Sequence, residues 1–587
     1  MKKLKSLLIL SLMVALALAV LFSSRGVAAA AYGAAVWDGT VTESFAGGTG
    51  TEKDPFQISN GAELAFLADR VNAGDPAYNG NTKYYILTAD IELNNTANWQ
   101  NWGINASGIR EWAPIGTYVD DYDFSKAFQA NFDGGGYKIK GIYINAASGY
   151  KGLFGAVYSN VIQNIGVEQS YIKGGNAVGG VAGIVGGAVG SVTNCYNAGI
   201  VMGTSTVGGV VGSVSGAGIV INCYNTGTVT GNEFIGGVAG GVLGSAAVNC
   251  YNTGAVTGAY GYAGGVAGGV VGGDAGGGIA NCYNAGGVAG SNYNCVGGVA
   301  GYIDSVIVAN CYYLTGRITI NGVLQTSAQE KGIGENNGGT AADILKFNVS
   351  GNLNGEIIIN ETQYNNLLDA LNGWRNNNAA YKQWYFIADI NNWYPVFAPT
   401  LKIIYFDQSG GAFSGTHDPV NPAVRHVYGG SNTELGGAVK TDYTFIGWFA
   451  DSGCTGNAVA AVGSMDYTRD ITLYAKWQSN FCTVTFVLSG GKGVSGSLTV
   501  DRGDVIDISG YIPALTGYEF AGWYLDNAGT QQAGNAITVN SDMHLYSKWT
   551  KNTVSDGCAL FSFNIGSSNT AVLLLGLLAM LFIRGKR

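Results

Sequence analysis

A ten-residue phrase that begins with Asn-Cys-Tyr recurs along the middle of the chain. It is written "NCYNAGIVMG" at 194–203, "NCYNTGTVTG" at 222–231, "NCYNTGAVTG" at 249–258 and "NCYNAGGVAG" at 281–290, and "NCYYLTG" at 310–316 closes the series. The starts of the phrase are 28, 27, 32 and 29 residues apart. Repetition at this interval indicates an array in which each copy packs on the next.

A second repeated phrase has nearly the same period as the first. Its five copies share the pattern G-G-V-(A/V)-G inside six-residue stretches that begin at 178, 207, 235, 263 and 296. The intervals between these starts are 29, 28, 28 and 33 residues. Two phrases with one common period indicate a single structural unit that is copied about five times along the chain.

Each unit consists of short Val and Ile runs broken by Gly and Asn, without the spacing of an amphipathic helix. Such a unit cannot bury its apolar face alone, so the sequence predicts a mainly β fold, a right-handed parallel β-solenoid with one copy per coil. Like residues should then stack about 4.8 Å apart. The Gly-Gly pairs predict tight corners with positive φ, and the repeated Asn predicts an amide ladder that satisfies polar groups at the corners.

The repeats resemble the GLUG-motif arrays of bacterial surface proteins. The likeness rests on "GLFG" at 152–155 and on the five G-G-V phrases. The preceding chain is similar to the usual lead-in of such arrays, with matching pieces "GGTGTEKDPFQIS" (47–59), "YYILTADIELN" (84–94), "WAPIG" (112–116) and "FDGGGYKIKGIYI" (132–144). The resemblance implies a solenoid with its N-terminal part at 31–175 and its repeats at 176–316, and it specifies no activity.

Five cysteines share one position of the repeat, and the tyrosine after each shares the next. They are Cys195, Cys223, Cys250, Cys282 and Cys311, followed by Tyr196, Tyr224, Tyr251, Tyr283 and Tyr312. Export would permit disulfides, but stacked cysteines have unfavourably directed Cβ atoms, and no C-x-x-C spacing supports a metal site. We predict a stack of small buried thiols. Which of Cys and Tyr faces inward stays open, because corners break the alternation of a strand.

The repeats lack the charged groups on which catalysis depends. No Lys or Arg lies between residues 173 and 317, and the acids in that interval are Glu233, Asp274 and Asp304, far apart along the array. Proton transfer in polysaccharide cleavage needs clustered carboxylates or a carboxylate with a base. We therefore predict no catalytic residue and no cofactor in the repeats.

The lead-in is richer in acids and leaves one enzymatic alternative open, a carbohydrate-active β-helix enzyme with its site there. Within it, "DDYD" at 120–123 offers Asp120, Asp121 and Asp123 as a weak calcium candidate, although a solvated loop is the favoured interpretation. Some GLUG arrays accompany zinc peptidases, but the three histidines, at 417, 426 and 544, never form the H-E-x-x-H spacing that such an enzyme requires.

Residues 317–400 are predicted to cap the array, and two similar modules follow at 401–478 and 481–550. The modules resemble the internalin-type B-repeat, also known as the Listeria–Bacteroides repeat, a small β-grasp-like module. Their shared tryptophans are Trp448 and Trp477 in the first and Trp523 and Trp549 in the second. We expect these rings to form the module cores. A glycan-binding role for them is the alternative.

The two ends predict export and anchoring. Residues 1–30 combine three lysines, an apolar stretch and "VAAAA" in the order of a signal peptide. Residues 551–587 hold the apolar run "AVLLLGLLAMLFI" before a basic end, with Cys558 as a possible processing point. We therefore expect a protein held at the bacterial cell surface, with its C-terminal tail in the membrane or cut and exchanged for an anchor.

A net charge of -9 and the lack of a basic stripe argue against nucleic acid as a partner. The features together predict a non-catalytic, monomeric cell-surface protein, an adhesin or a surface-binding stalk. Its partner would be a protein or glycan on a host or neighbouring cell. Repeated exposed side chains, including any Tyr or Asn row that faces solvent, would provide many weak contacts that act together.

Overall fold

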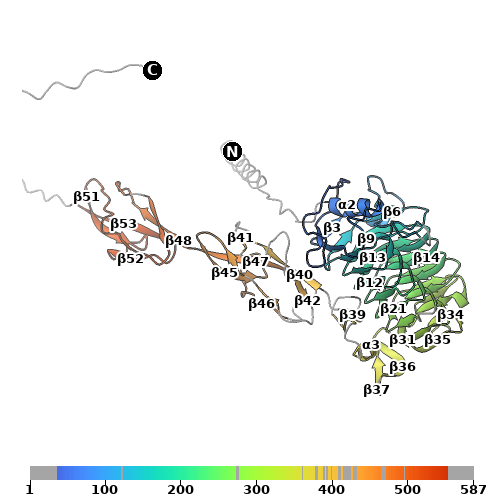
Figure 1. The fold of residues 1–587 in the computed structure, drawn as a ribbon. Helices are drawn as coiled ribbons and strands as arrows, with labels where there is room; N and C mark the ends of the chain where they lie inside the picture. The colour runs from blue at the N-terminus through green and yellow to red at the C-terminus, as the bar shows by residue number, and fades with distance from the viewer. Residues whose placement is uncertain are drawn as a thin grey trace, which may run out of the picture. The chain divides into compact units, whose positions relative to one another are not determined.

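The computed structural model describes residues 36–552, apart from 120–122, 273–276, 360, 377–380, 388–390, 392–393, 398–399, 407–411, 414–424, 428–432, 436, 464–470 and 495. The predicted signal peptide and residues 553–587 of the predicted tail, Cys558 among them, lie outside the described residues. The chain divides into two compact units, residues 1–439 with 445–476 and residues 440–444 with 477–587. Figure 1 shows the β-solenoid and its cap and, further along the chain, two small β modules.

The lead-in starts the solenoid. Helix α2 (Gly61–Asn72) begins after Asn60, whose Oδ1 accepts hydrogen bonds from the amides of Ala62 and Glu63, each at 3.0 Å. This cap satisfies two of the amides that a helix start leaves without a partner. The helix lies at the N-terminal end of the solenoid (Figure 1), and its apolar side chains join the solenoid core. The strands here are β1 (Phe56–Ile58), β2 (Tyr84–Leu87), β3 (Ile91–Glu92), β4 (Asn131–Asp133), β5 (Lys138–Lys140) and β6 (Tyr143–Asn145).

Each repeat contributes strands to three sides of the solenoid. One side is a seven-stranded sheet of β7 (Phe154–Tyr158), β11 (Ala182–Gly186), β15 (Val211–Ser215), β20 (Ala239–Leu243), β25 (Ala267–Val271), β30 (Ala300–Asp304) and β34 (Ile333–Asn337). The adjoining five-stranded sheet contains β10 (Asn176–Gly179), β14 (Ser205–Gly208), β19 (Glu233–Gly236), β24 (Ala263–Gly264) and β29 (Val296–Gly297).

The remaining strands belong to one large sheet that carries the Asn-Cys-Tyr phrases. Its members within the repeats are β8 (Val161–Gln163), β9 (Gly166–Lys173), β12 (Ser191–Thr193), β13 (Tyr196–Met202), β16 (Ile219–Ile221), β17 (Tyr224–Asn225), β18 (Thr228–Gly231), β21 (Ala246–Val248), β22 (Tyr251–Asn252), β23 (Val256–Gly258), β26 (Gly278–Ala280), β27 (Tyr283–Asn284), β28 (Val288–Gly290), β31 (Ile307–Leu314) and β32 (Ile318–Ile320).

The register places like residues over one another. The residue directly before each central glycine pair follows this rule, since Val178 pairs with Val207, Val207 with Ile235 and Ile235 with Ala263. The tyrosines of the Cys phrases pair in the same way along the whole series. These pairings are parallel, so the predicted mainly β fold with a parallel β-solenoid is confirmed. The right-handed sense and the grasp-like topology of the modules stay predictions.

The glycine pairs of the repeat do not adopt positive φ, and that prediction was wrong. A side chain at Gly179 would overlap the carbonyl oxygen of Ala182, and one at Gly236 would overlap the carbonyl oxygen of Ala239. The glycines are required because two stretches of backbone approach closely there. The left-handed corner is taken by the Asn of each Asn-Cys-Tyr phrase, as in Asn222 at φ 54°.

Two asparagine ladders run along the solenoid, as the sequence predicts. In the first, the Nδ2 of each corner Asn donates to the Oδ1 of the Asn one coil earlier, over 2.6–3.0 Å, through Asn194, Asn222, Asn249, Asn281 and Asn310. In the second, each Nδ2 donates one coil forward over 2.7–2.8 Å, through Asn197, Asn225, Asn252 and Asn284. Both ladders satisfy polar groups that the solenoid buries.

The apolar residue after each glycine pair fills the solenoid core. The five valines at this position are fully buried: Val181, Val210, Val238, Val266 and Val299. Complete burial of one such side chain is worth about 1.5–3 kcal/mol relative to exposure. The core is therefore a continuous column of stacked aliphatic side chains. An isolated coil would lose most of this burial, because its neighbours on both sides provide it.

The cap follows the last coil. β35 (Thr340–Phe347) pairs in parallel with β31, and the chain then forms antiparallel pairs. The elements after the repeats are β33 (Val323–Leu324), β36 (Asn352–Ile359), β37 (Thr362–Asn366), α3 (Leu367–Arg375), β38 (Trp384–Tyr385) and β39 (Val396–Phe397). Asn366 caps α3 through its Oδ1, which accepts from the amide of Asp369 at 2.9 Å.

The two modules have matching four-stranded sheets. The first contains β42 (Arg425–Val427), β40 (Thr400–Phe406), β47 (Ile471–Ser479) and β45 (Tyr443–Phe449), in that order. The second contains β49 (Ser497–Asp501), β48 (Phe481–Val487), β53 (Met543–Lys551) and β51 (Tyr518–Tyr524), with a separate pair β50 (Val505–Asp507) and β52 (Ala536–Thr538). In both sheets the first and last strands of the module pair in parallel at the centre.

Replacement of one ladder residue tests how much the ladders stabilise the solenoid. Asn252 is fully buried, donates to Asn284 and accepts from Asn225 at 2.8 Å. We expect Asn252→Ala to lower the free energy of unfolding by about 1–3 kcal/mol for each buried group left without a partner. Chemical denaturation followed by circular dichroism measures the effect, with the exposed Asn81→Ala as control. Equal stability of the two variants would show that the ladder is dispensable.

Candidate binding groove

The five repeat cysteines lie inside the solenoid, fully buried. Each Sγ donates to the carbonyl oxygen two residues earlier at 3.2 Å, as Cys223 does to Ile221 and Cys282 to Ala280. None of the eight described cysteines forms a disulfide. Burial raises the pKa of the Cys195 and Cys282 thiols. The column therefore packs as small protonated apolar groups.

The repeat tyrosines stack on the outside of the column. The rings of Tyr196 and Tyr224 are 4.7 Å apart, those of Tyr224 and Tyr251 also 4.7 Å, and those of Tyr251 and Tyr283 5.2 Å, all within 5° of parallel. Tyr312 continues the register beneath Tyr283, and its hydroxyl donates to Asn310 at 2.6 Å. Burial raises the pKa of the Tyr251 and Tyr283 hydroxyls.

A returning segment of the cap covers this tyrosine row. Trp384 is buried against the rings of both Tyr251 and Tyr283, and its Nε1 donates to the ladder residue Asn249 at 2.8 Å. The backbone amide of Lys382 donates to the Oδ1 of Asn222 at 3.1 Å. The tyrosine and asparagine rows, which the sequence offered as candidate binding surfaces, are thus largely enclosed by the protein itself.

The described acidic residues of the lead-in form hydrogen bonds within its turns and to neighbouring amide side chains. Asp123 accepts from the amide of Ser125 at 2.9 Å, and its hydrogen bonds to Ser125 hold its pKa below the usual range. Asp120 and Asp121, the rest of the calcium candidate, lie outside the described residues. Asp133 accepts from the side chains of Gln163 and Asn164 at 3.0 Å. Across the described part of the chain, no three His, Cys, Asp or Glu side chains form a possible metal site.

Two of the four module tryptophans are deeply buried. Trp448 is 2% exposed and Trp523 is 4% exposed, and the Nε1 of Trp523 donates to the carbonyl of Tyr511 at 2.7 Å. Trp477 and Trp549 are half-buried. The ring of Trp549 meets Phe520 edge-on at 5.7 Å. Trp448 and Trp523 therefore belong to the module cores, as the sequence predicts.

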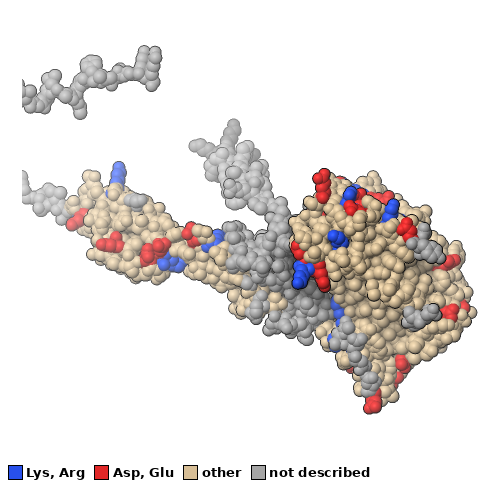
Figure 2. All heavy atoms as spheres, viewed as in Figure 1, with Lys and Arg blue, Asp and Glu red and all other residues tan. Residues whose placement is uncertain are grey.

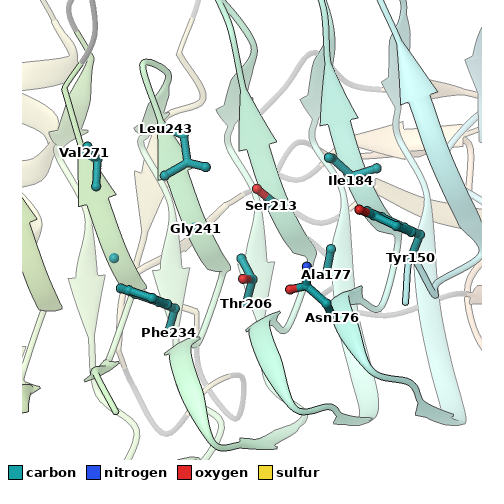
Figure 3. Close-up of a pocket in the computed structure, with 11 residues that line it drawn as sticks. Tyr150, Asn176, Ala177, Ile184, Thr206, Ser213, Phe234, Gly241, Leu243 and Val271 are labelled. Carbon is teal, nitrogen blue, oxygen red and sulfur yellow. The ribbon is translucent and has the colours of Figure 1, made fainter. Parts of the chain in front are cut away.

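The outer surface of the seven-stranded sheet carries a groove of about 220 Å³ (Figure 3). Its floor is a row of outward-facing residues in register, Ile184, Ser213, Gly241 and Gly269, on four successive strands. The side chains become smaller along this row, so the floor deepens toward Gly241 and Gly269. One wall of the groove is formed by the position two residues further along each strand, and Leu243 belongs to this wall.

The opposite wall comes from a left-handed corner at the edge of the five-stranded sheet. Tyr150, Ala177, Thr206 and Phe234 occupy this corner in four successive coils, with φ of 59°, 55°, 55° and 50°. Figure 3 shows the two rings at the ends of the groove, with Ala177 and Thr206 between them. Three strand spacings separate the rings, about 14 Å.

Further aromatic pairs extend the groove at both ends. Beyond Ile184 lies a second hollow of about 140 Å³, where the rings of Phe124 and Tyr158 stack at 3.9 Å. The ring of Tyr118 stacks on Tyr150 at 4.3 Å. At the other end the ring of Phe234 lies 5.3 Å from that of Tyr262. Ile184 lines both hollows, which therefore lie next to each other on the sheet.

The described residues that line the two hollows are all uncharged. Neither hollow is lined by Lys, Arg, Asp or Glu among the described residues. Two acids lie in register with lining residues. Glu335 follows Tyr302 in the floor row, two strands after Gly269, and accepts from the hydroxyl of Tyr262 at 3.0 Å. Glu233 belongs to the column of Asn176 and contacts Ser205 at 3.4 Å. Figure 2 shows charged side chains gathered over the lead-in, while the rest of the visible solenoid is almost free of them. The groove thus offers rings and hydroxyl groups without a net charge.

Sequence reasoning missed the residues of this groove. The signal is present in the sequence, at the position two residues before each glycine pair, which reads Ala177, Thr206, Phe234 and Tyr262 while the glycines and the valine that follow stay constant. Variation at one position of a regular repeat marks a place that the fold does not dictate. The role of this position depends on the left-handed backbone corner at which it lies, and the period of the sequence does not reveal that corner.

Comparison with known proteins identifies the two modules. The model of the Listeria-Bacteroides repeat domain matches residues 403–476 and 483–548, which confirms that part of the expectation. The GLUG resemblance stays an expectation. Within the part of the chain that the structure describes, no helix has both the length and the hydropathy to cross a membrane.

Three relatives match parts of this chain. Halomucin of Haloquadratum walsbyi is 32% identical over 178 residues, 30% of this chain and 2% of that protein. Two proteins of Evansella cellulosilytica, provisionally described as a membrane protein and a Gly-rich membrane protein, are 35% and 34% identical over 22% and 25% of this chain. The matches span 18% and 17% of those two proteins, so this chain corresponds to only a small part of each relative.

One solved structure is also similar. It is a crystal structure from Bacteroides ovatus, provisionally described as an immunoglobulin A1 protease, with 21% identity and a TM-score of 0.44 over 60% of this chain and 95% of that one.

Thiol labelling tests the cysteine column. Of the described cysteines, Cys454 is half-buried and the other seven are buried. The five thiols of the repeats are fully buried, so a reagent in solution cannot reach them in the folded protein. Burial also raises the pKa of the Cys195 and Cys282 thiols, and the thiolate is the reactive form. Of the described thiols, we expect a disulfide-exchange reagent to modify the half-buried Cys454 first, and the five buried repeat thiols only after denaturation. Mass mapping that finds native ladder disulfides or rapid ladder labelling would contradict the packing.

Proposed function

We propose that this chain is a non-catalytic cell-surface protein whose solenoid binds its ligand in the groove of the seven-stranded sheet. The observation that carries the proposal is the groove with a neutral lining, whose floor is held in register by four parallel strands and which has an aromatic ring at each end. Concave sites with apolar walls and a few placed polar groups are the usual form of a ligand site.

A binding role fits the described side chains better than the enzymatic alternative. Asp90 accepts from the backbone amide of Lys138 at 2.9 Å, and Asp133 holds the end of an asparagine ladder. These carboxylates serve local structure and are spread over separate turns. Proton transfer in glycoside hydrolysis needs two carboxylates on either side of one bond, and the groove is lined by none.

The surface location has separate support. The N-terminal segment has the order of a signal peptide, and the C-terminal segment has an apolar run before basic residues. The two relatives from Evansella are described as membrane proteins. In this proposal the two Listeria-Bacteroides modules act as spacers between the tail and the solenoid, as an adhesin or surface-binding stalk requires. The partner is a molecule of a host or neighbouring cell.

Obstruction of the groove tests the proposal. Ile184 occupies the floor position equivalent to Ser213, so Ser213→Ile adds a side chain that the sheet already accommodates. The matched control is Ser191→Ile on β12, where the register partner is Ile219, outside the groove. We expect full-length Ser213→Ile to lose about tenfold in binding to intact bacterial or epithelial cells, as a hot-spot loss would, and Ser191→Ile to bind normally.

The same assay separates binding from catalysis. We expect replacement of Asp120, Asp121 and Asp123 by Asn to leave cell binding unchanged, and the native protein to release no reducing ends or peptides from the cells. Release of products that the triple replacement abolishes would establish the enzymatic alternative. Unchanged cell binding by Ser213→Ile would remove the groove from the function.

A further inference from the structure

We infer that the groove binds an uncharged glycan chain, with Tyr150 and Phe234 as the rings on which its sugar units stack. This inference rests on the proposed function, since it names the ligand class of the same groove. It is argued from the conformation of the wall residues, the fit of Phe234 to its floor, and the polar groups between the rings.

The wall residues are poorly suited to the backbone conformation that they adopt. The other left-handed corners of the repeats carry residues that tolerate φ near 55°: one is Asn in every coil from Asn164 to Asn310, and another is Gly or Ser from Ser159 to Ser305. The groove corner instead carries Tyr, Ala, Thr and Phe. Left-handed backbone is unfavourable for each of these four residue types, because the Cβ lies too close to the following carbonyl oxygen. A β-branched or bulky residue at such φ is an outlier that points to a functional constraint.

The floor is matched to the ring of Phe234. A Cβ at Gly269 would lie 2.5 Å from the Cδ1 of Phe234, so the ring lies over the bare backbone of that glycine. In the same way a Cβ at Gly241 would lie 2.9 Å from the methyl group of Thr206. The half-buried Phe234 ring is therefore fixed in place while one side stays open to the groove.

Hydroxyl and amide groups lie between the two rings. Thr206, Ser213 and Asn176 line the groove in the interval between Tyr150 and Phe234 (Figure 3). A sugar ring has an apolar face of C–H groups and an edge of hydroxyls, so it suits a site that offers aromatic faces and neutral polar groups. The interval of about 14 Å between the rings exceeds one sugar unit, which favours a chain over a monosaccharide.

The chemistry of the groove disfavours other ligands. An acidic glycan would bring carboxylates or sulfates into a site without a cation among its described lining residues, and a buried charge without a partner is costly. An extended peptide binds best to an open sheet edge. Here the floor is the face of a sheet whose inner strands β11, β15, β20 and β25 each pair on both sides.

Replacement of the ring by a residue that suits the corner separates binding from folding. Asn tolerates left-handed φ, so we expect Phe234→Asn to keep the melting temperature of the protein. Calorimetric titration of the full chain with neutral hexasaccharides of glucose, xylose, mannose and N-acetylglucosamine is expected to find one that binds. Phe234→Asn and Tyr150→Asn should each weaken its affinity about tenfold, as aromatic hot spots do, and Phe234→Tyr should retain it.

Two comparisons complete the experiment. The exposed Tyr260, outside the groove, provides a control, and Tyr260→Ala should bind normally. Affinity should change less than about twofold between low and high salt, because no charge pair is formed. Hexagalacturonate that binds more tightly than every neutral hexasaccharide would overturn the inference.

The outcomes separate this inference from the proposed function. Cell binding that Phe234→Asn abolishes, without affinity for any neutral hexasaccharide, would overturn the glycan assignment and leave the groove as a site for a protein partner. Neutral-glycan binding unaffected by either ring replacement would overturn the assignment of the rings. Failure of both cell binding and glycan binding would overturn the proposed function itself.

Discussion

The structure depends on the stacking of identical side chains from coil to coil. Backbone pairing brings Asn over Asn, Cys over Cys and Tyr over Tyr, and each amide of a ladder donates to the next. A polar group on this axis is satisfied only if the next coil repeats it. Insertions are accommodated outside the stack. The longest interval between two glycine phrases, 33 residues from 263 to 296, contains the short helix η2 (Tyr293–Cys295). Ala263 nevertheless pairs with Val296, so the register continues past this insertion.

This constraint determines where a binding site can be. The valines, cysteines and asparagines of each unit are committed to the core and to the ladders, and the cap segment covers much of the tyrosine row. Free positions remain on the outer face of the seven-stranded sheet and at its corner. The groove occurs there because the floor residues become smaller toward Gly269 and the corner row carries a ring at each end, and neither change disturbs the stack beneath.

A repeat with so few charges also limits the chemistry of its surface. Between residues 173 and 317 the sequence has no Lys or Arg that could bind an anion, and the described residues that line the groove include neither a carboxylate nor a base. Recognition must therefore use shape, aromatic faces and neutral hydrogen bonds. These interactions are individually weak, and a protein held at a surface in many copies can combine them through avidity.

The sequence by itself determined the period, the parallel stacking, the asparagine ladder and the two modules, because each of these is a pattern of like residues at fixed intervals. It did not determine that the glycine pairs mark close backbone crossings, since Gly serves both crowding and positive φ. Nor could it place Phe234 over Gly269, or Trp384 on Asn249 across 135 residues of chain. Left-handed corners interrupt the alternation of inward and outward residues, and long-range contacts have no period. For these physical reasons only the tertiary structure decided which rows are buried and where the groove lies.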